Sequence, residues 1–99
     1  MEIATRKITQ KKLKKPKSFQ VLLLNDDYTT MEFVVIVLMK FFSKSQDAAY
    51  ALMLKIHIEG EAVCGVYSHD VAQTKVTQVI EFSRENEQPL MCIIRELSD

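Results

Sequence analysis

The chain has 99 residues, with 13 basic and 13 acidic side chains, and 47% of its residues are hydrophobic. This length suits one small domain, and the composition is ordinary for a soluble globular protein. The two glycines are too few for a glycine-rich phosphate loop, and two cysteines with two irregularly spaced histidines argue against a structural zinc site.

The first 17 residues differ in charge from the rest of the chain. They contain Arg6 and six lysines against Glu2 alone, so the remaining residues are net acidic. Without a sustained apolar period, residues 1–17 are predicted to form a flexible basic N-terminal extension, and residues 18–99 a folded core domain. The longest apolar run, Phe33–Met39, is too short for a membrane span. With no signal-peptide core either, we expect a cytoplasmic protein.

The first elements of the core are a strand, a turn and a helix. Phe19–Leu24 is rich in strand-forming residues, and the Asn and Asp residues that follow it favour a turn. Thr29 and Glu32 fit a capping box that opens a helix over residues 30–42. Apolar residues at helical spacing predict the inner face of this helix: Met31, Val34, Val35, Leu38 and Phe42.

A second helix should begin after Ser45 and end at Gly60, which suits a left-handed helix end. Ala62–Tyr67 then reads as a strand, and Ser68 as the cap of a third helix that ends before Pro89. Leu90–Glu96 alternates between apolar and other residues, as a half-buried strand does. The predicted order is β-α-α-β-α-β, in a single α+β domain with a three-stranded antiparallel sheet packed on three helices.

Two groups of polar residues stand out beside these helices. The first is Asn25-Asp26-Asp27 at the strand-to-helix junction, and the second is His57 near the end of the second helix. Together they offer acceptors from several directions, as the three donors of a protonated α-amino group require. Taken alone, Asn25-Asp26-Asp27 is also explained by turn formation, and His57 by a role as a helix cap or as a satisfied core residue. Four apolar residues on the two helices suit either core packing or a side-chain pocket: Met31, Val34, Met53 and Ile56.

The stretch Leu23–Phe33, LLNDDYTTMEF, closely resembles the motif of the ClpS family around NDDYTPMEF. The resemblance covers about residues 17–97, in matching order and spacing. Further matches lie at Lys40-Phe41-Phe42, Leu52-Met53, His57, Gly60, Cys64-Gly65, Ala72-Gln73-Thr74-Lys75-Val76, Arg84-Glu85-Asn86 and Pro89-Leu90.

The resemblance implies an adaptor rather than an enzyme, with no cofactor. ClpS proteins bind substrates whose N-terminal residue is Leu, Phe, Tyr or Trp, and they deliver these substrates to a ClpA-type AAA+ unfoldase for degradation by the Clp peptidase. The family fold is an α+β domain similar to the C-terminal domain of ribosomal stalk proteins, which agrees with the predicted element order. A monomer is the default for the family.

The resemblance also implies roles for single residues. Asn25 and His57 match residues that bind the substrate α-amino group, and Asp26 and Asp27 match the acidic pair that supports this contact. Which of the two carboxylates contacts the amine stays open. Met31 matches a gatekeeper against β-branched N-terminal residues. The side-chain pocket is implied to consist of Leu23, Thr29, Met31, Val34, Met53 and Ile56.

Asp70 and Lys75 in the third helix match residues that contact the unfoldase, although a solvated helix face explains the pair as well. Three positions depart from the family pattern. Thr30 replaces a proline, Ile36 replaces a commonly polar residue, and Ile56 is bulkier than the frequent valine. The first predicts a looser turn, the second an exposed apolar side chain, and the third a tighter pocket that favours Leu or Phe over Trp.

Two other classes of function stay open at this point. A small hydrolase could use His57 with Asp26 or Asp27 as acid and base, although no nucleophile or metal motif accompanies them. A nucleic-acid- or ribosome-associated module could use the basic extension, which lacks aromatic residues for base stacking. Cys64 and Cys92 lie in apolar stretches, and we expect two reduced, buried thiols.

Overall fold

The computed structural model describes residues 16–97. The predicted order β-α-α-β-α-β is confirmed, and the predicted extension over residues 1–17 falls almost wholly outside the described part. No helix between residues 16 and 97 is both long and apolar enough to cross a membrane. The elements are β1 (Ser18–Leu24), α2 (Met31–Phe42), α3 (Gln46–Glu59), β2 (Glu61–Tyr67), α4 (His69–Glu85) and β3 (Met91–Leu97).

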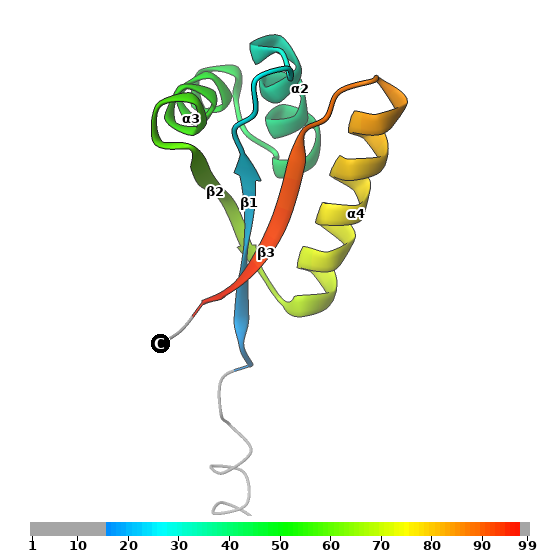
Figure 1. The fold of residues 1–99 in the computed structure, drawn as a ribbon. Helices are drawn as coiled ribbons and strands as arrows, with labels where there is room; N and C mark the ends of the chain where they lie inside the picture. The colour runs from blue at the N-terminus through cyan, green and yellow to red at the C-terminus, as the bar shows by residue number, and fades with distance from the viewer. Residues whose placement is uncertain (1–15, 98–99) are drawn as a thin grey trace, which may run out of the picture.

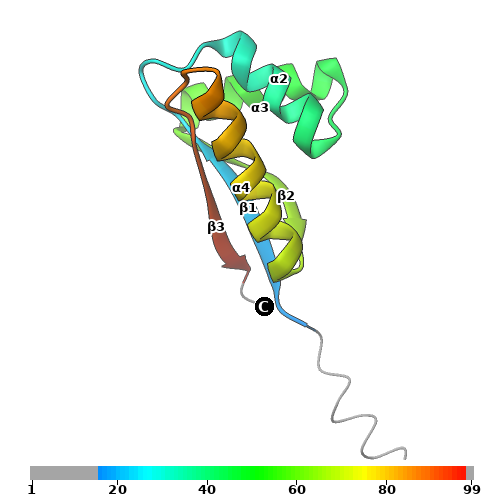
Figure 2. The ribbon, with the colours of Figure 1, turned by 90° about the vertical axis from the view of Figure 1, so that its right-hand side faces the viewer.

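The three strands form one antiparallel sheet in the order β2-β1-β3, so the first strand of the domain lies in the middle. Helix α4 runs along one face of this sheet, while α2 and α3 pack near the end where β1 finishes (Figures 1 and 2). The α+β architecture predicted from the sequence is therefore confirmed. It places the loop between β1 and α2 beside both α2 and α3.

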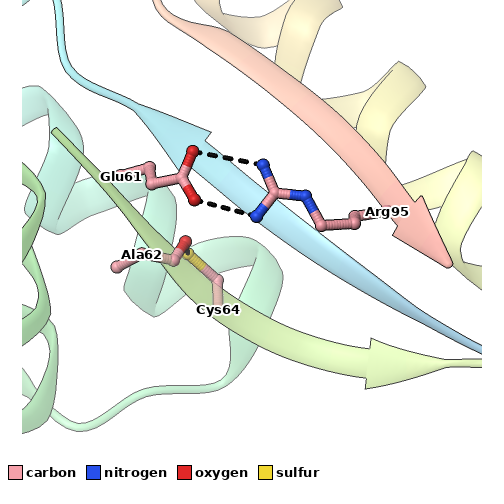
Figure 3. Close-up of polar contacts among 4 residues, drawn as sticks. All are labelled: Glu61, Ala62, Cys64 and Arg95. Carbon is pink, nitrogen blue, oxygen red and sulfur yellow. Dashed lines mark hydrogen bonds and ion pairs between the residues drawn. The ribbon is translucent and has the colours of Figure 1, made fainter. Parts of the chain in front are cut away.

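The two faces of the sheet follow from the alternation of side chains along β1. Val21 and Leu23 are completely buried and belong to the core formed with the helices. Leu22 points to the other face, between its strand partners Val63 and Ile93. On that same face Arg95 of β3 reaches across β1 to Glu61 of β2 (Figure 3), with an Nη1–Oε2 distance of 2.8 Å.

Helix α2 begins one residue later than predicted, and its cap is Thr30 rather than Thr29. The Thr30 hydroxyl accepts a hydrogen bond from the Phe33 N–H at 3.1 Å. The Thr29 hydroxyl is directed instead at the Asp26 carboxylate, to which it donates at 2.6 Å. The capping box of Thr29 and Glu32 is therefore wrong. Thr30, which stands where the family motif has a proline, supplies the cap itself. A proline could not do so, because its side chain has no oxygen to accept the hydrogen bond.

The predicted inner face of α2 is partly right. Val34, Leu38 and Phe42 are buried as expected, but Met31 is exposed and Val35 is only half-buried. Phe33 and Val37 are buried instead, and the sequence analysis missed both. The reason is that seven consecutive residues from Phe33 are apolar, so the helix has no polar face whose position would reveal the inner one.

The signals at the ends of α3 are confirmed. The Ser45 hydroxyl accepts from the Ala48 N–H at 3.2 Å, and Gly60 ends the helix with a φ of 93°. At this φ a side chain would be strained, which explains a glycine here. Ser68 lies at the start of α4 as predicted, but its side chain makes no capping hydrogen bond.

Both cysteines are free and buried, as the sequence analysis expected. Burial raises the pKa of each thiol to about 12, because the low-dielectric interior disfavours the thiolate. A reactive cysteine needs the opposite shift and an accessible position. Neither buried thiol meets these requirements.

Candidate functional site

A cavity of about 430 Å³ opens between α2, α3 and the loop that joins β1 to α2. It brings together nine of the ten residues that the sequence analysis assigned to the amine site and the side-chain pocket. Two further residues, Tyr28 and Thr30, also line it. The lining residues are Asn25, Asp26, Asp27, Tyr28, Thr29, Thr30, Met31, Val34, Met53, Ile56 and His57.

The floor of the cavity is apolar and almost completely buried. Val34 comes from the first turn of α2, and Met53 and Ile56 come from α3, three positions apart on one helix face. His57 follows directly after Ile56 and is exposed. Met31 stands at the start of α2 with half of its surface exposed. The cavity therefore has an apolar interior and a solvent-accessible rim.

Asp26 holds the shape of the loop that forms one side of the rim. Its carboxylate accepts hydrogen bonds from the Tyr28 N–H at 2.8 Å, from the Thr29 N–H at 2.7 Å and from the Thr29 hydroxyl at 2.6 Å. This is the Asx turn that the sequence predicts. Burial alone would raise the pKa of Asp26, but these hydrogen bonds, helped by the charge of Arg84, lower it below the ordinary value.

Unlike the carboxylate of Asp26, the polar side chains of Asn25, Asp27 and His57 do not hold the loop. All three residues are exposed, and within residues 16–97 their side chains make no hydrogen bond or ion pair. The backbone fixes where they stand, because the Asn25 N–H donates to the Gly60 carbonyl at 2.9 Å. This bond joins the end of β1 to the end of α3. Acceptor groups from both elements therefore face the same opening.

A loop far away in the sequence supports the start of α2. The Gln88 Oε1 atom accepts from the Thr30 N–H at 3.1 Å, between residues 58 positions apart. Arg84 in turn donates to the carbonyls of Gln88 and Leu90, each at 2.9 Å. Sequence analysis missed Gln88, since nothing in a single sequence indicates that the α4–β3 loop reaches α2.

Leu23 is the one predicted pocket residue that does not line the cavity. It is completely buried in the core, where it pairs with Ala62 of β2 and Cys92 of β3. Strand alternation turns its side chain toward the helices beneath the site. Leu23 thus supports the site from below.

The two residues assigned to an unfoldase contact lie on α4, outside the cavity. Asp70 is exposed in the first turn, with its carboxylate 3.6 Å from His69 Nδ1. Lys75 is half-buried, and its ammonium donates to the Phe41 carbonyl at 2.7 Å and lies 5.7 Å from the centre of the Tyr67 ring. Lys75 therefore links α4 to the last turn of α2.

The fold and the cavity define a small α+β binding domain in which an apolar hollow is rimmed by hydrogen-bond acceptors. Among residues 16–97 no cluster of three or more metal-ligating side chains occurs. The family model described as "ATP-dependent Clp protease adaptor protein ClpS" matches residues 14–93. The chain belongs to the ClpS family, which consists of substrate adaptors and not of enzymes.

Individual relatives agree with this assignment. A ClpS adapter protein of Nitrosospira multiformis is 54% identical over 86% of this chain and 83% of the relative. One of Brucella canis is 52% identical over 89% of this chain and 76% of the relative. The solved structure of Agrobacterium tumefaciens ClpS2 bound to L-phenylalaninamide superposes with a TM-score of 0.81 at 38% identity, covering 84% of this chain and all of that one. The likeness of the two structures confirms the fold class.

Proposed function

We propose that the cavity captures substrate proteins by a bulky hydrophobic N-terminal residue, namely Leu, Phe, Tyr or Trp. The adaptor then delivers them to a ClpA-type AAA+ unfoldase for degradation by the Clp peptidase. One observation carries the proposal: an apolar, buried floor lies directly beneath exposed acceptors from two elements. The related ClpS2 was solved with L-phenylalaninamide, which has a free α-amino group and an aromatic side chain.

The rim suits the ammonium of a protein N-terminus. An α-ammonium has three donors, which the Asn25 carbonyl, the carboxylate of Asp27 and a ring nitrogen of His57 can accept. Asp26 contributes by holding the loop, because its own carboxylate already accepts three hydrogen bonds. An internal peptide nitrogen carries a single donor and no charge, so the rim selects chain ends.

The floor suits one apolar side chain. Val34, Met53 and Ile56 bury it, and full burial of a Leu or Phe side chain contributes about 1.5–3 kcal/mol. Met31 stands at the rim, where a branch at the substrate Cβ collides with a long side chain. The bulk of Ile56 narrows the floor, and we expect peptides that begin with Leu or Phe to bind more tightly than those that begin with Trp. Equal affinities would contradict this preference.

Delivery requires a second surface, which the proposal assigns to α4. Asp70 and Lys75 contact the N-terminal domain of the unfoldase, and neither residue lines the cavity. Substrate and unfoldase can thus be held at the same time. In this proposal the basic residues 1–17 are engaged during delivery, and the adaptor acts as a cytoplasmic monomer.

Peptide binding tests the proposal directly. We expect a fluorescent peptide that begins with Leu to bind, and its N-acetylated form and an Ile-initiated form to fail. Acetylation removes the charge and two donors, and the unpaired acceptors cost about 1–3 kcal/mol. Equal binding of the acetylated peptide would contradict the proposal. Salt-sensitive binding of oligonucleotides without peptide binding would favour the nucleic-acid module instead.

A further inference from the structure

A second hollow, of about 410 Å³, lies along the seam between α2 and α3. We call it the seam groove. The residues from α3 are spaced three or four positions apart, and those from α2 form two adjacent rows with a spacing of four, so each set occupies one helix face. The seam groove is lined by Met31, Glu32, Val35, Ile36, Met39, Gln46, Tyr50 and Met53.

The seam groove adjoins the cavity of the candidate site, because Met31 and Met53 line both. Its surface is unusually apolar for an accessible one. Four of its side chains are large hydrophobics that are between 43% and 56% exposed: Met31, Ile36, Met39 and Tyr50. A cluster of this kind marks a binding surface more often than an isolated exposed residue does. Ile36, at a helix position that the resemblance marks as commonly polar in the family, lies within it.

The direction of a bound chain follows from where the cavity and the seam groove lie along α3. His57 lies near the end of α3, whereas Gln46 and Tyr50 of the seam groove lie in the first half of that helix. A substrate whose ammonium is held at His57 and Asn25 can therefore continue past Met31 into the seam groove. Met31 and Met39 are eight positions apart in α2, about 12 Å along the helix. An extended chain covers this length in about three or four residues.

We propose that the seam groove binds apolar side chains at positions 2–4 of the substrate chain, so that the adaptor reads more than the N-terminal residue. This inference rests on the proposed function of the cavity. The occupant is the same extended peptide, entering over Met31, and the contacts are apolar.

Two peptides that both begin with Leu test the inference. One carries serine at positions 2–4 and the other carries leucine or isoleucine there. Because two or three side chains are partly buried in the seam groove, we expect the apolar peptide to bind about 5- to 30-fold more tightly in fluorescence anisotropy. Equal affinities would overturn the inference while leaving the proposed function intact. If neither peptide binds, and N-acetylation of the peptides changes nothing, the proposed function fails as well.

Variants then locate the contact. The double variant Ile36→Ser, Met39→Ser should bind the two peptides equally, with the affinity for the serine peptide unchanged. Ile58→Ser is the matched control, since Ile58 is a 77% exposed residue of α3 outside both hollows. It should keep the difference, and thermal unfolding should show that all variants are folded.

Two other occupants give different results. If the groove were an interface between two copies of this chain, the wild type would sediment as a dimer and the double variant as a monomer. If it bound the unfoldase, the double variant would lose unfoldase binding and keep its preference for the apolar peptide. Either result would overturn the inference.

Discussion

Polar side chains differ between the hydrophobic core of the domain and the rim of the cavity. In the core, every buried side-chain nitrogen or oxygen among residues 16–97 has a partner, as the Ser83 hydroxyl does with the Val79 carbonyl at 2.7 Å. At the rim, Asn25, Asp27 and His57 face solvent from fixed backbone positions. The core therefore supplies stability, whereas the rim groups to which we assign recognition are exposed and contribute little to it. Substitutions in the two regions should separate these properties.

The largest effect is expected for Leu23→Ala in the core. The variant leaves a cavity between β1 and the helices, and such truncations lower the free energy of unfolding by about 2–5 kcal/mol. Urea denaturation followed by circular dichroism measures this. A change below about 0.5 kcal/mol, as we expect for the exposed Ile58→Ala control, would show that Leu23 is not part of the close-packed core.

The opposite pattern is expected at the rim. Asn25→Ala and His57→Ala each remove an acceptor that the proposed function assigns to the substrate ammonium, and we expect affinity for a Leu-initiated peptide to fall about tenfold or more. The free energy of unfolding should stay within about 0.5 kcal/mol of the wild type, because neither side chain is buried. The backbone bond from Asn25 to Gly60 survives either change. A loss of stability equal to the loss of affinity would contradict the division between the regions.

Asp26 lies at the rim of the cavity, but its side chain has a structural role because it holds the loop. Asp26→Ala removes three hydrogen bonds from the loop, and by analogy with helix caps it should cost about 1 kcal/mol at neutral pH. Affinity for the peptide should fall as well, since the loop positions the groups that we propose bind the substrate amine.

The pH dependence of stability gives a sharper test of Asp26. Its pKa in the folded protein lies below the ordinary value of 3.8. The stabilisation from its ionised form is therefore complete above that value and is lost as the pH falls through the folded-state pKa. Acid titrations of unfolding should show a smaller loss for Asp26→Ala than for the wild type. Parallel titration curves would show that Asp26 contributes nothing to acid sensitivity.

The smallest effect is expected on the open face of the sheet, at the pair of Glu61 and Arg95 (Figure 3). The bidentate pair lowers the pKa of Glu61 and raises that of Arg95. Both groups are solvated, and such pairs contribute little. Glu61→Gln should leave peptide affinity unchanged and alter stability only slightly, with the difference vanishing at high salt. A large change in either quantity would assign this face a role in the site.

Much of the fold could be predicted because its signals are local. Gly60 ends α3, Ser45 caps it, and the alternation at Leu90 and Cys92 predicts the buried side of β3. The chemistry of an α-amino group suggested the pairing of Asn25 with His57 and the family resemblance supported it, but nothing local in the sequence brings together two residues 32 positions apart. The cavity that unites them depends on the packing of α3 against α2 and β2.

The sequence by itself determined the element order, both ends of α3 and the residue types of the site, because turns, caps and apolar periods act over a few neighbouring residues. Only the tertiary structure decided between Thr29 and Thr30 as the cap, turned Leu23 into the core, buried Val37 and brought Gln88 to α2. The burial of Val37 and the position of Gln88 depend on contacts between segments distant in the chain, whereas the cap was decided by the hydrogen bonds of Thr29 and Thr30 to near neighbours. A uniformly apolar helix can be rotated about its axis without changing its sequence pattern, and only its neighbours decide which face is buried.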